Sequence, residues 1–165
     1  MRHIISILLQ NEAGALARVA NLFSSRGFNI ESLNVAPTSN TLVSRLTLVT
    51  VGSDEVIDQI TKQLGKLVDV VSLRDLTATD HVERELALFK VRSSESAEKD
   101  LSELLDRYGV KVLDDRDGHR TVELIGDGPE IDRFLREAAS LIDVEAVARS
   151  GAVAISREDP LTEST

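Results

Sequence analysis

The spacing of apolar residues constrains the fold of this chain most strongly, because it changes between a strand-like and a helix-like period in a definite order. Residues 3–9 are predicted as a strand, and a one-sided apolar stripe then marks a helix from about Ala15 to Arg26. Strands are predicted over residues 29–36 and 42–51, a second helix begins with Ser53 as its N-cap, and residues 68–76 form a closing strand. The order β-α-β-β-α-β is that of a ferredoxin-like unit.

The same order recurs in the second half of the chain. Residues 84–91 are predicted as a strand, and apolar spacing over residues 97–108 marks a helix. A hairpin joins residues 110–114 to residues 120–126 through an Asp-Gly turn, Pro129 opens another helix, and residues 141–150 close the unit. We therefore predict an α+β chain of two tandem ferredoxin-like βαββαβ domains. The predicted divisions are residues 1–76, a linker at 77–83, residues 84–156, and a flexible acidic tail at 157–165.

Each predicted sheet has helices on one face only, so its other face and an edge need cover. We expect this chain of 165 residues to cover them by forming a homodimer. The alternative is a sheet face that carries polar side chains and stays in contact with water.

Composition argues against several classes of protein. The chain has 28 acidic and 19 basic residues, a formal charge of −9 and only 3% aromatic residues, which disfavours nucleic-acid binding. It has no cysteine, so disulfides and zinc-thiolate sites are excluded. No apolar run reaches the ~18 residues of a membrane span, and the N-terminal segment lacks a signal-peptide cleavage site, so we expect a cytoplasmic protein.

The loop before the first predicted helix has the properties of a small-anion site. The first amides of a helix lack intrahelical partners, and the helix dipole adds about half a positive charge there. Gly14 lets a ligand approach the backbone, and the Asn11 amide can serve a carboxylate or an ammonium group. A zwitterionic amino acid needs both. The plainer alternative is that Asn11 caps a turn, Gly14 relieves strain, and Asn29 only begins a strand.

Several long segments resemble one known family in order and spacing. They are "NEAGALARVANLFSSRGFNIESLNVAPT", "SRLTLVT", "KQLGKLVDVVSLRDL", "HVEREL" and "DVEAVARSG". Together they resemble the small regulatory subunits of acetohydroxyacid synthase (acetolactate synthase) over nearly the whole chain. The first half then resembles an ACT domain, a module that binds amino-acid effectors between two copies of itself.

This resemblance implies a function and a site. It implies a homodimer through the ACT domains, with Asn11, Gly14, Ala15 and Leu16 of one copy around the charged groups of valine. Asn29 and Ile30 of the second copy would close the pocket. The resemblance further implies activation of a large catalytic subunit and feedback inhibition by valine in branched-chain amino acid biosynthesis.

The same resemblance also assigns the cofactors and part of the pocket wall. Thiamine diphosphate, magnesium and FAD are expected on the large subunit and none on this chain. The isopropyl group of valine would need an apolar wall, for which Leu16, Ile30 and Val35 are the candidates.

Catalysis by the chain itself is not favoured by its polar residues. The three histidines, His3, His81 and His119, are scattered, and we expect each to lie on the surface without a role. The segment Glu83–Glu85 is expected to form surface ion pairs at a strand rim, and the acidic turn near Asp115 lacks the pattern of a calcium loop. Two alternatives stay open: a stand-alone amino-acid-binding ACT regulator of another enzyme, and a small ferredoxin-like enzyme.

Overall fold

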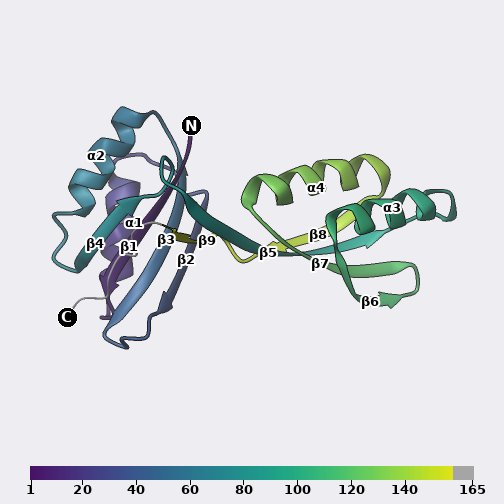
Figure 1. Cartoon of the computed structure of the whole chain (residues 1–165), viewed down its shortest axis with the longest axis horizontal. Coiled ribbons are helices and arrows are strands. Elements are labelled where there is room, and N and C mark those ends of the chain that lie inside the picture. The colour runs from purple at the N-terminus through teal and green to yellow at the C-terminus, as the bar shows by residue number, and fades with distance from the viewer. Residues whose placement is uncertain (158–165) are drawn as a thin grey trace. The chain divides into compact units, whose positions relative to one another are not determined.

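The computed structural model describes residues 1–157, which form two compact units. The first unit comprises residues 1–82 together with the segment that begins at Ala152, and the second comprises Glu83–Gly151. The predicted α+β fold, with two βαββαβ units in tandem, is confirmed (Figure 1). Of the predicted acidic tail, residues 158–165 lie outside the described residues.

The first unit contains one antiparallel sheet of four strands in the order β2-β3-β1-β4. Its elements are β1 (Arg2–Gln10), α1 (Ala15–Ser25), β2 (Ser32–Pro37), β3 (Val43–Val51), α2 (Asp54–Leu64) and β4 (Val70–Asp75). The second strand therefore begins three residues later than predicted, and Asn29 and Ile30 lie in the connection before it. Ser53 caps α2 as predicted, because its hydroxyl accepts a hydrogen bond from the Val56 amide at 3.4 Å.

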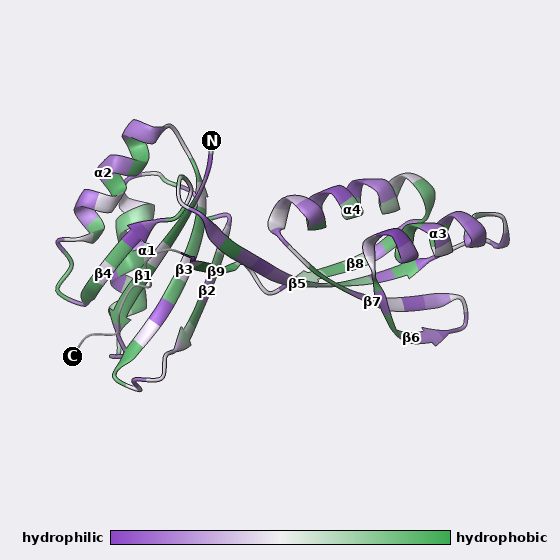
Figure 2. Cartoon of the chain, in the orientation of Figure 1, coloured by the Kyte–Doolittle hydropathy of each residue, from purple (hydrophilic) through white to green (hydrophobic). Residues whose placement is uncertain are grey.

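Helices α1 and α2 lie on the same face of this sheet (Figure 1). In Figure 2 each helix carries both green and purple residues along its length, as an amphipathic helix does. The buried stripe of α1 consists of Ala15, Val19 and Phe23, and it packs on the apolar side chains of β1 and β3. Helix α1 thereby holds its N-terminal end close to the loop that leaves β1.

The opposite face of the first sheet is partly covered by a strand that the sequence analysis did not predict. This strand, β9 (Val153–Ser156), pairs with β5, the first strand of the second half. Ala152 and Ala154 are buried there in one cluster with Ile4, Val49 and Leu76. Residues 152–156, which were predicted as part of the second domain, belong to the first unit, because the small side chains of Ala152 and Ala154 pack over these three residues.

The second unit repeats the architecture with strands in the order β6-β7-β5-β8. Its elements are β5 (His81–Arg92), a 3-10 turn (Glu95–Ala97), α3 (Glu98–Tyr108), β6 (Lys111–Arg116), β7 (His119–Gly126), α4 (Gly128–Leu141) and β8 (Asp143–Arg149). β5 starts inside the segment that was predicted as a linker. The predicted hairpin turn is confirmed, since Asp117 and Gly118 both have positive φ angles, 52° and 79°.

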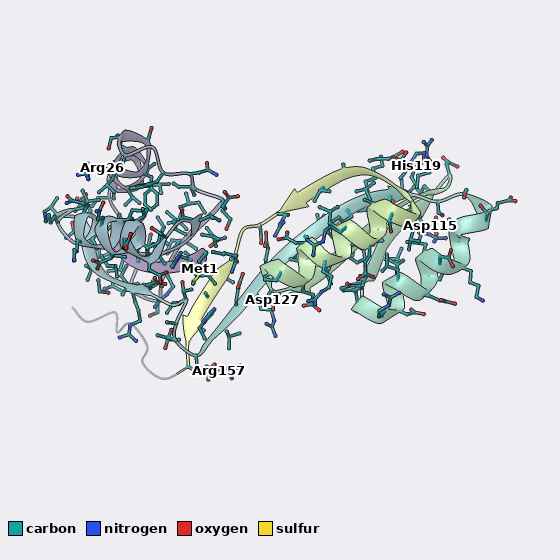
Figure 3. The ribbon with its side chains drawn as sticks, turned by 90° about the horizontal axis from the view of Figure 1, so that it is seen from above. Met1, Arg26, Asp115, His119, Asp127 and Arg157 are labelled. Atoms are coloured by element: carbon teal, nitrogen blue, oxygen red, sulfur yellow. The ribbon has the colours of Figure 1, made fainter. Side chains whose placement is uncertain are left out.

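The core of the second unit lies between its sheet and helices α3 and α4. Phe134 of α4 contacts Phe89 at a ring-centroid distance of 4.9 Å and Tyr108 at 5.3 Å. Figure 3 shows Asp127 at the start of α4, where its carboxylate accepts a hydrogen bond from the Glu130 amide at 2.7 Å. Pro129 stands in the first turn of this helix, as predicted.

The expectation of surface ion pairs at residues 83–85 is wrong. Glu83 and Glu85 are buried, with 8% and 4% of their surface exposed. The Glu85 carboxylate accepts two hydrogen bonds of 2.8 Å from the Arg149 guanidinium, which also bonds Asp132 at 2.6 Å. Side chains of β5 alternate between the interior and the surface, and Glu85 points to the interior. The two hydrogen bonds from Arg149 offset the free-energy cost of burying its charge.

Candidate functional site

The loop that leaves β1 is fixed to the turn between β2 and β3 by Asn11. The Asn11 amide N–H donates to the Leu42 carbonyl at 2.8 Å, and its side-chain Nδ2 donates to the Thr41 carbonyl at 2.9 Å. The residue is exposed, and among the described residues its Oδ1 accepts no hydrogen bond. Asn11 therefore presents an oriented acceptor next to the start of α1.

Gly14 is the N-cap of α1 and adopts a left-handed conformation, with φ 89° and ψ −12°. Its carbonyl accepts the first helical hydrogen bond, from the Arg18 amide at 3.0 Å. No side chain caps the helix, and within residues 1–157 no acceptor bonds the amides of Leu16 and Ala17. Two unpaired amides thus stand at the positive end of the helix dipole.

Arg18 adds a positive charge to this helix end, a contribution that the sequence analysis missed. Its Nε and Nη2 bind the Asp69 carboxylate, the latter at 2.7 Å, and Asp69 is only 3% exposed. The remaining nitrogen, Nη1, lies 2.9 Å from the place that a Cβ on Gly14 would occupy. The guanidinium is therefore held over the backbone of Gly14, and no hydrogen bond engages Nη1 within the part of the chain that the structure describes.

The ion pair between Arg18 and Asp69 shifts the pKa values of both groups. The hydrogen bond from Arg18 holds the pKa of the Asp69 carboxyl below its usual value, and the bond to Asp69 raises the pKa of Arg18. Asp69 interrupts the apolar run of residues 67–71, and a lone carboxylate in such a run is the signal that could have located this pair.

Asn29 and Ile30 lie beyond the other end of α1. Asn29 is exposed, its Nδ2 donates to Glu31 Oε1 at 2.8 Å, and its carbonyl accepts from the Thr50 hydroxyl at 2.6 Å. Ile30 is half-buried and packs against the core of the first unit. An eleven-residue helix is about 16 Å long, so one copy of the chain does not bring these two residues to Gly14.

The remaining predicted site residues divide between core and surface. The Ala15 side chain is 4% exposed and belongs to the core, and its amide already donates to the Glu12 carbonyl at 3.2 Å, so Ala15 offers no free donor to a ligand. Leu16 and Val35 are 37% and 40% exposed, which is unusual for large apolar side chains. Val35 lies on β2, an edge strand that pairs only with β3 among the described residues.

The histidines are distributed differently from the expectation. His3 is buried at 3% exposure, because the Asp75 carboxylate lies 3.3 Å from its Nδ1; the expectation of a surface histidine is therefore wrong for this residue. His119 Nδ1 lies 2.9 Å from Glu145 on the exposed hairpin side (Figure 3). Within residues 1–157, no group of three or more histidine and acidic side chains is arranged to hold a metal ion. None of the described helices combines the length and apolarity that a membrane crossing requires.

Comparisons with known proteins cover both halves of the chain. Residues 5–72 match a family model described as the AHAS small subunit-like ACT domain, and residues 84–158 match the model for the small subunit of acetolactate synthase. This chain is 44% identical to each of two relatives, the small subunits of acetolactate synthase isozyme 3 from Salmonella typhimurium and Escherichia coli. Each match extends over 161 residues, which is 98% of this chain and 99% of the relative.

A solved structure is similar over nearly the whole length of the chain. The crystal structure of the acetolactate synthase small subunit from Thermotoga maritima superposes with a TM-score of 0.82 and 35% sequence identity. The match covers 96% of this chain and 99% of that one. Its extent means that both units, and not the first alone, have counterparts in that protein.

Proposed function

Because the chain belongs to the family of acetolactate synthase small subunits, the non-catalytic partners of that enzyme, we propose that it activates a large catalytic subunit and makes it sensitive to valine. The observation that carries the proposal is the N-terminal end of α1, where unpaired amides and the Arg18 guanidinium converge. Thiamine diphosphate, magnesium and FAD belong to the large subunit in this proposal.

The carboxylate of valine binds at the start of α1. The amides of Leu16 and Ala17 donate to its oxygens, and Arg18 Nη1 supplies a charged donor beside them. Charge-assisted hydrogen bonds are roughly twice as strong as neutral ones, and the helix dipole acts in the same direction. Asp69 keeps the guanidinium oriented toward Gly14 rather than toward water.

The ammonium group of valine is bound by asparagine oxygens. Asn11 Oδ1 comes from the same copy as the helix, because the Nδ2 of this residue is already used at Thr41. Asn29 comes from a second copy, where its hydrogen bond to the Glu31 carboxylate leaves Oδ1 available and brings a negative charge close. The length of α1 is what requires two copies, so the site exists only in a homodimer.

Valine binding and dimer geometry are coupled in this arrangement. The exposed edge of β2 allows the two first units to lie side by side, and Leu16, Ile30 and Val35 form the apolar wall for the isopropyl group. A ligand shifts an equilibrium only by its difference in affinity for the two states. A coupling of about 1–3 kcal/mol, typical of allosteric proteins, corresponds to a change of roughly 5–150-fold in the affinity between sites.

Calorimetry with valine tests the placement of the site. Asn29→His removes the amide oxygen and adds a larger ring, so we expect valine to bind at least about tenfold more weakly. Asn21→His, at an exposed position in the middle of α1, changes the same residue type and should leave binding within twofold of the parent. Equal valine affinity in the parent and both variants would contradict the assignment of Asn29.

The regulatory role needs an assay with the catalytic partner. The purified chain is added to its large subunit, and acetolactate formation is measured with and without valine. We expect the parent chain to raise the rate and valine to reverse the increase. A chain that co-purifies with the large subunit yet changes neither the rate nor the valine response would refute the proposal.

A further inference from the structure

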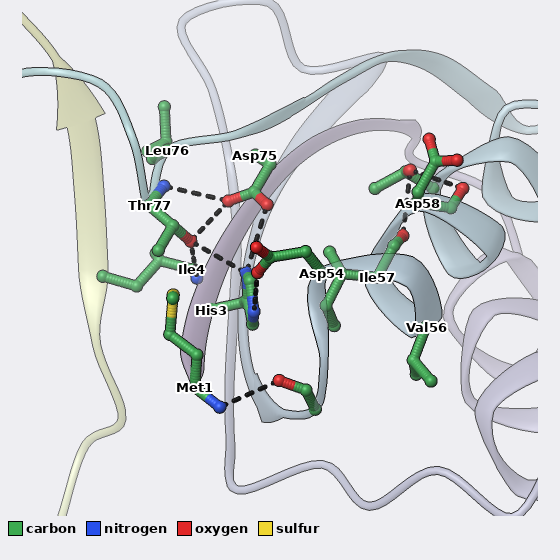
Figure 4. Close-up of polar contacts among 12 residues, drawn as sticks. Met1, His3, Ile4, Asp54, Val56, Ile57, Asp58, Asp75, Leu76 and Thr77 are labelled. Atoms are coloured by element: carbon green, nitrogen blue, oxygen red, sulfur yellow. Dashed lines mark hydrogen bonds and ion pairs between the residues drawn. The ribbon is translucent and has the colours of Figure 1, made fainter.

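A pocket at the other end of the first sheet is lined by charged residues that the proposed function does not use. Its volume is about 410 Å³, and it lies between the start of β1, the first two turns of α2 and the segment that follows β4. The residues that matter here are His3, Asp54, Asp58 and Asp75, with Met1 and Ile57 as apolar neighbours (Figure 4). All of them belong to the first unit.

Asp75 holds the His3 ring in a fixed orientation. His3 Nδ1 lies 3.3 Å from Asp75 Oδ2, while Asp75 Oδ1 accepts hydrogen bonds from the amide and the hydroxyl of Thr77, at 2.9 and 2.5 Å. The Thr77 hydroxyl in turn accepts from the Ile4 amide at 3.0 Å. The Asp75 carboxylate can only accept hydrogen bonds. A neutral His3 that bonds Asp75 through Nδ1 therefore carries its proton on Nδ1.

The second ring nitrogen makes no hydrogen bond among the described residues. His3 Nε2 is buried and makes no hydrogen bond within residues 1–157, although the residue as a whole is 3% exposed. Asp54 Oδ1 lies 3.5 Å from it and forms an ion pair with it when the ring is protonated (Figure 4). In the neutral ring both atoms are acceptors, and one of them is negatively charged, so they repel one another unless a donor lies between them.

The surrounding charges favour a cation. Asp54, Asp58 and Asp75 contribute three carboxylates, of which Asp58 is paired with Lys62 at 2.6 Å. The α-ammonium of Met1 is bound to the Gly52 carbonyl at 2.9 Å. A metal ion fits poorly, because no group of three or more ligating side chains is arranged for one among the described residues.

We propose that this pocket binds the ammonium group of a small aliphatic amine, with one N–H donated to His3 Nε2 and another to Asp54. An ammonium group has three donors and no acceptor, and it reaches both acceptors when the Asp54 side chain, which is 78% exposed, turns away from its position 3.5 Å from Nε2. The alkyl chain lies against Ile57 and the Met1 side chain. A volume of about 410 Å³ is in the range of small-ligand pockets. The site is separate from the helix end assigned to valine.

The test uses the full chain and n-butylammonium chloride as the probe. The imidazole nitrogens are followed by ¹H–¹⁵N NMR, with His81 and His119 as internal references in the same spectrum. We expect a saturable shift of His3 Nε2 with the amine, and none with 1-butanol, sodium butyrate or potassium chloride at equal concentration.

Two variants in the same helical turn assign the binding. Asp54→Asn removes the proposed partner of the ammonium group and should weaken binding about tenfold or more. Glu55→Gln removes one negative charge from the same turn of α2, but Glu55 does not line the pocket, so binding should stay within twofold. Equal losses in both variants would mean that only the general charge of the helix end attracts the amine.

Three results with the parent chain would overturn the proposal. One is an imidazole of His3 that is protonated on both nitrogens at neutral pH without any amine, because Asp54 would then be its permanent partner. Another is a shift produced as well by 1-butanol as by the amine. The third is Mg²⁺ that shifts Nε2 at lower concentration than butylammonium, which would make the pocket a metal site.

Discussion

Gly14 satisfies two requirements at one backbone position. Its φ of 89° lies in the left-handed region, which costs other L-residues roughly 1–2 kcal/mol. A side chain there would also meet Arg18 Nη1 at 2.9 Å, and Asp69 prevents the guanidinium from moving aside freely. Glycine is thus needed both for the conformation of the loop and for the placement of the charge above it.

Gly14→Ala separates these two requirements when it is compared with Gly109→Ala. Gly109 has a similar φ of 62°, but a Cβ there would meet nothing within 4 Å. Urea unfolding followed by circular dichroism should show a loss of about 1–2 kcal/mol in each variant. Calorimetry should show weaker valine binding only for Gly14→Ala, because only this substitution displaces Arg18. Equal valine affinity in the two variants would remove Arg18 from the proposed site.

The candidate site was predictable from sequence only where it depends on residues that are neighbours in the chain. The loop from Asn11 to Leu16 and the helix that it opens follow from local patterns, since a glycine before an apolar stripe marks a helix start. The partnership of Arg18 with Asp69 joins residues 51 positions apart, and that of His3 with Asp75 joins residues 72 apart. Such pairs depend on strand order and register, which spacing alone does not specify.

At the scale of elements, two arginines of different burial join β5 and β8 by ion pairs. Arg149 binds Glu85, whose side chain is 3% exposed, and these bonds raise the pKa of the guanidinium. Arg92 binds Asp143 at 3.0 Å, with both of these side chains more than half exposed, and it also lies 3.7 Å from the Glu145 carboxylate. A comparison of the two arginines measures how much burial adds to the contribution of an ion pair to stability within one sheet.

Arg149→Ala should destabilise the second unit far more than Arg92→Ala. The first substitution leaves the Glu85 carboxylate buried without its charged partner, which costs about 3–5 kcal/mol. The second removes the contacts of an exposed arginine with Asp143 and Glu145 and should cost less than about 1 kcal/mol. Urea unfolding measures both. Similar small losses would show that water reaches Glu85 once the arginine is removed.

The elements themselves followed from the sequence wherever a cap or turn marked them. Ser53, the Asp-Gly turn at residues 117–118 and Pro129 all stand where they were expected, because each acts on the residues next to it. Strand β9 was missed, since four residues carry too little pattern to distinguish a strand from a tail. Its position depends on packing over Ile4 and Leu76, which lie far away in sequence.

At the scale of the whole molecule, the first unit is built from two separate parts of the chain. Residues 1–82 form its sheet and helices, and the segment from Ala152 returns to cover one sheet face after the second unit is complete. The second unit is therefore an insertion between the main part of the first unit and its last strand.

A chain that ends after Gly151 should have a destabilised first unit. Ile4, Val49 and Leu76 lose part of their cover. Full burial of one such side chain contributes about 1.5–3 kcal/mol, so full exposure of all three would cost about 5–9 kcal/mol; we expect roughly half of that, because β9 covers them from one side only. Hydrogen exchange at Ile4 and Val49 measures it residue by residue. A chain that ends after Arg157 retains β9 and serves as the control. Equal protection in both chains would show that β9 contributes nothing to the first unit.

The late return of β9 has a consequence for synthesis on the ribosome. The strand that covers one face of the first sheet leaves the exit tunnel only after about 80 residues beyond Leu76 have been added. At roughly 5–20 residues per second, one apolar face of the first sheet stays exposed on the nascent chain for about 4–16 s before β9 can pack on it. During that interval the nascent sheet is a natural substrate for chaperones that bind exposed apolar surfaces.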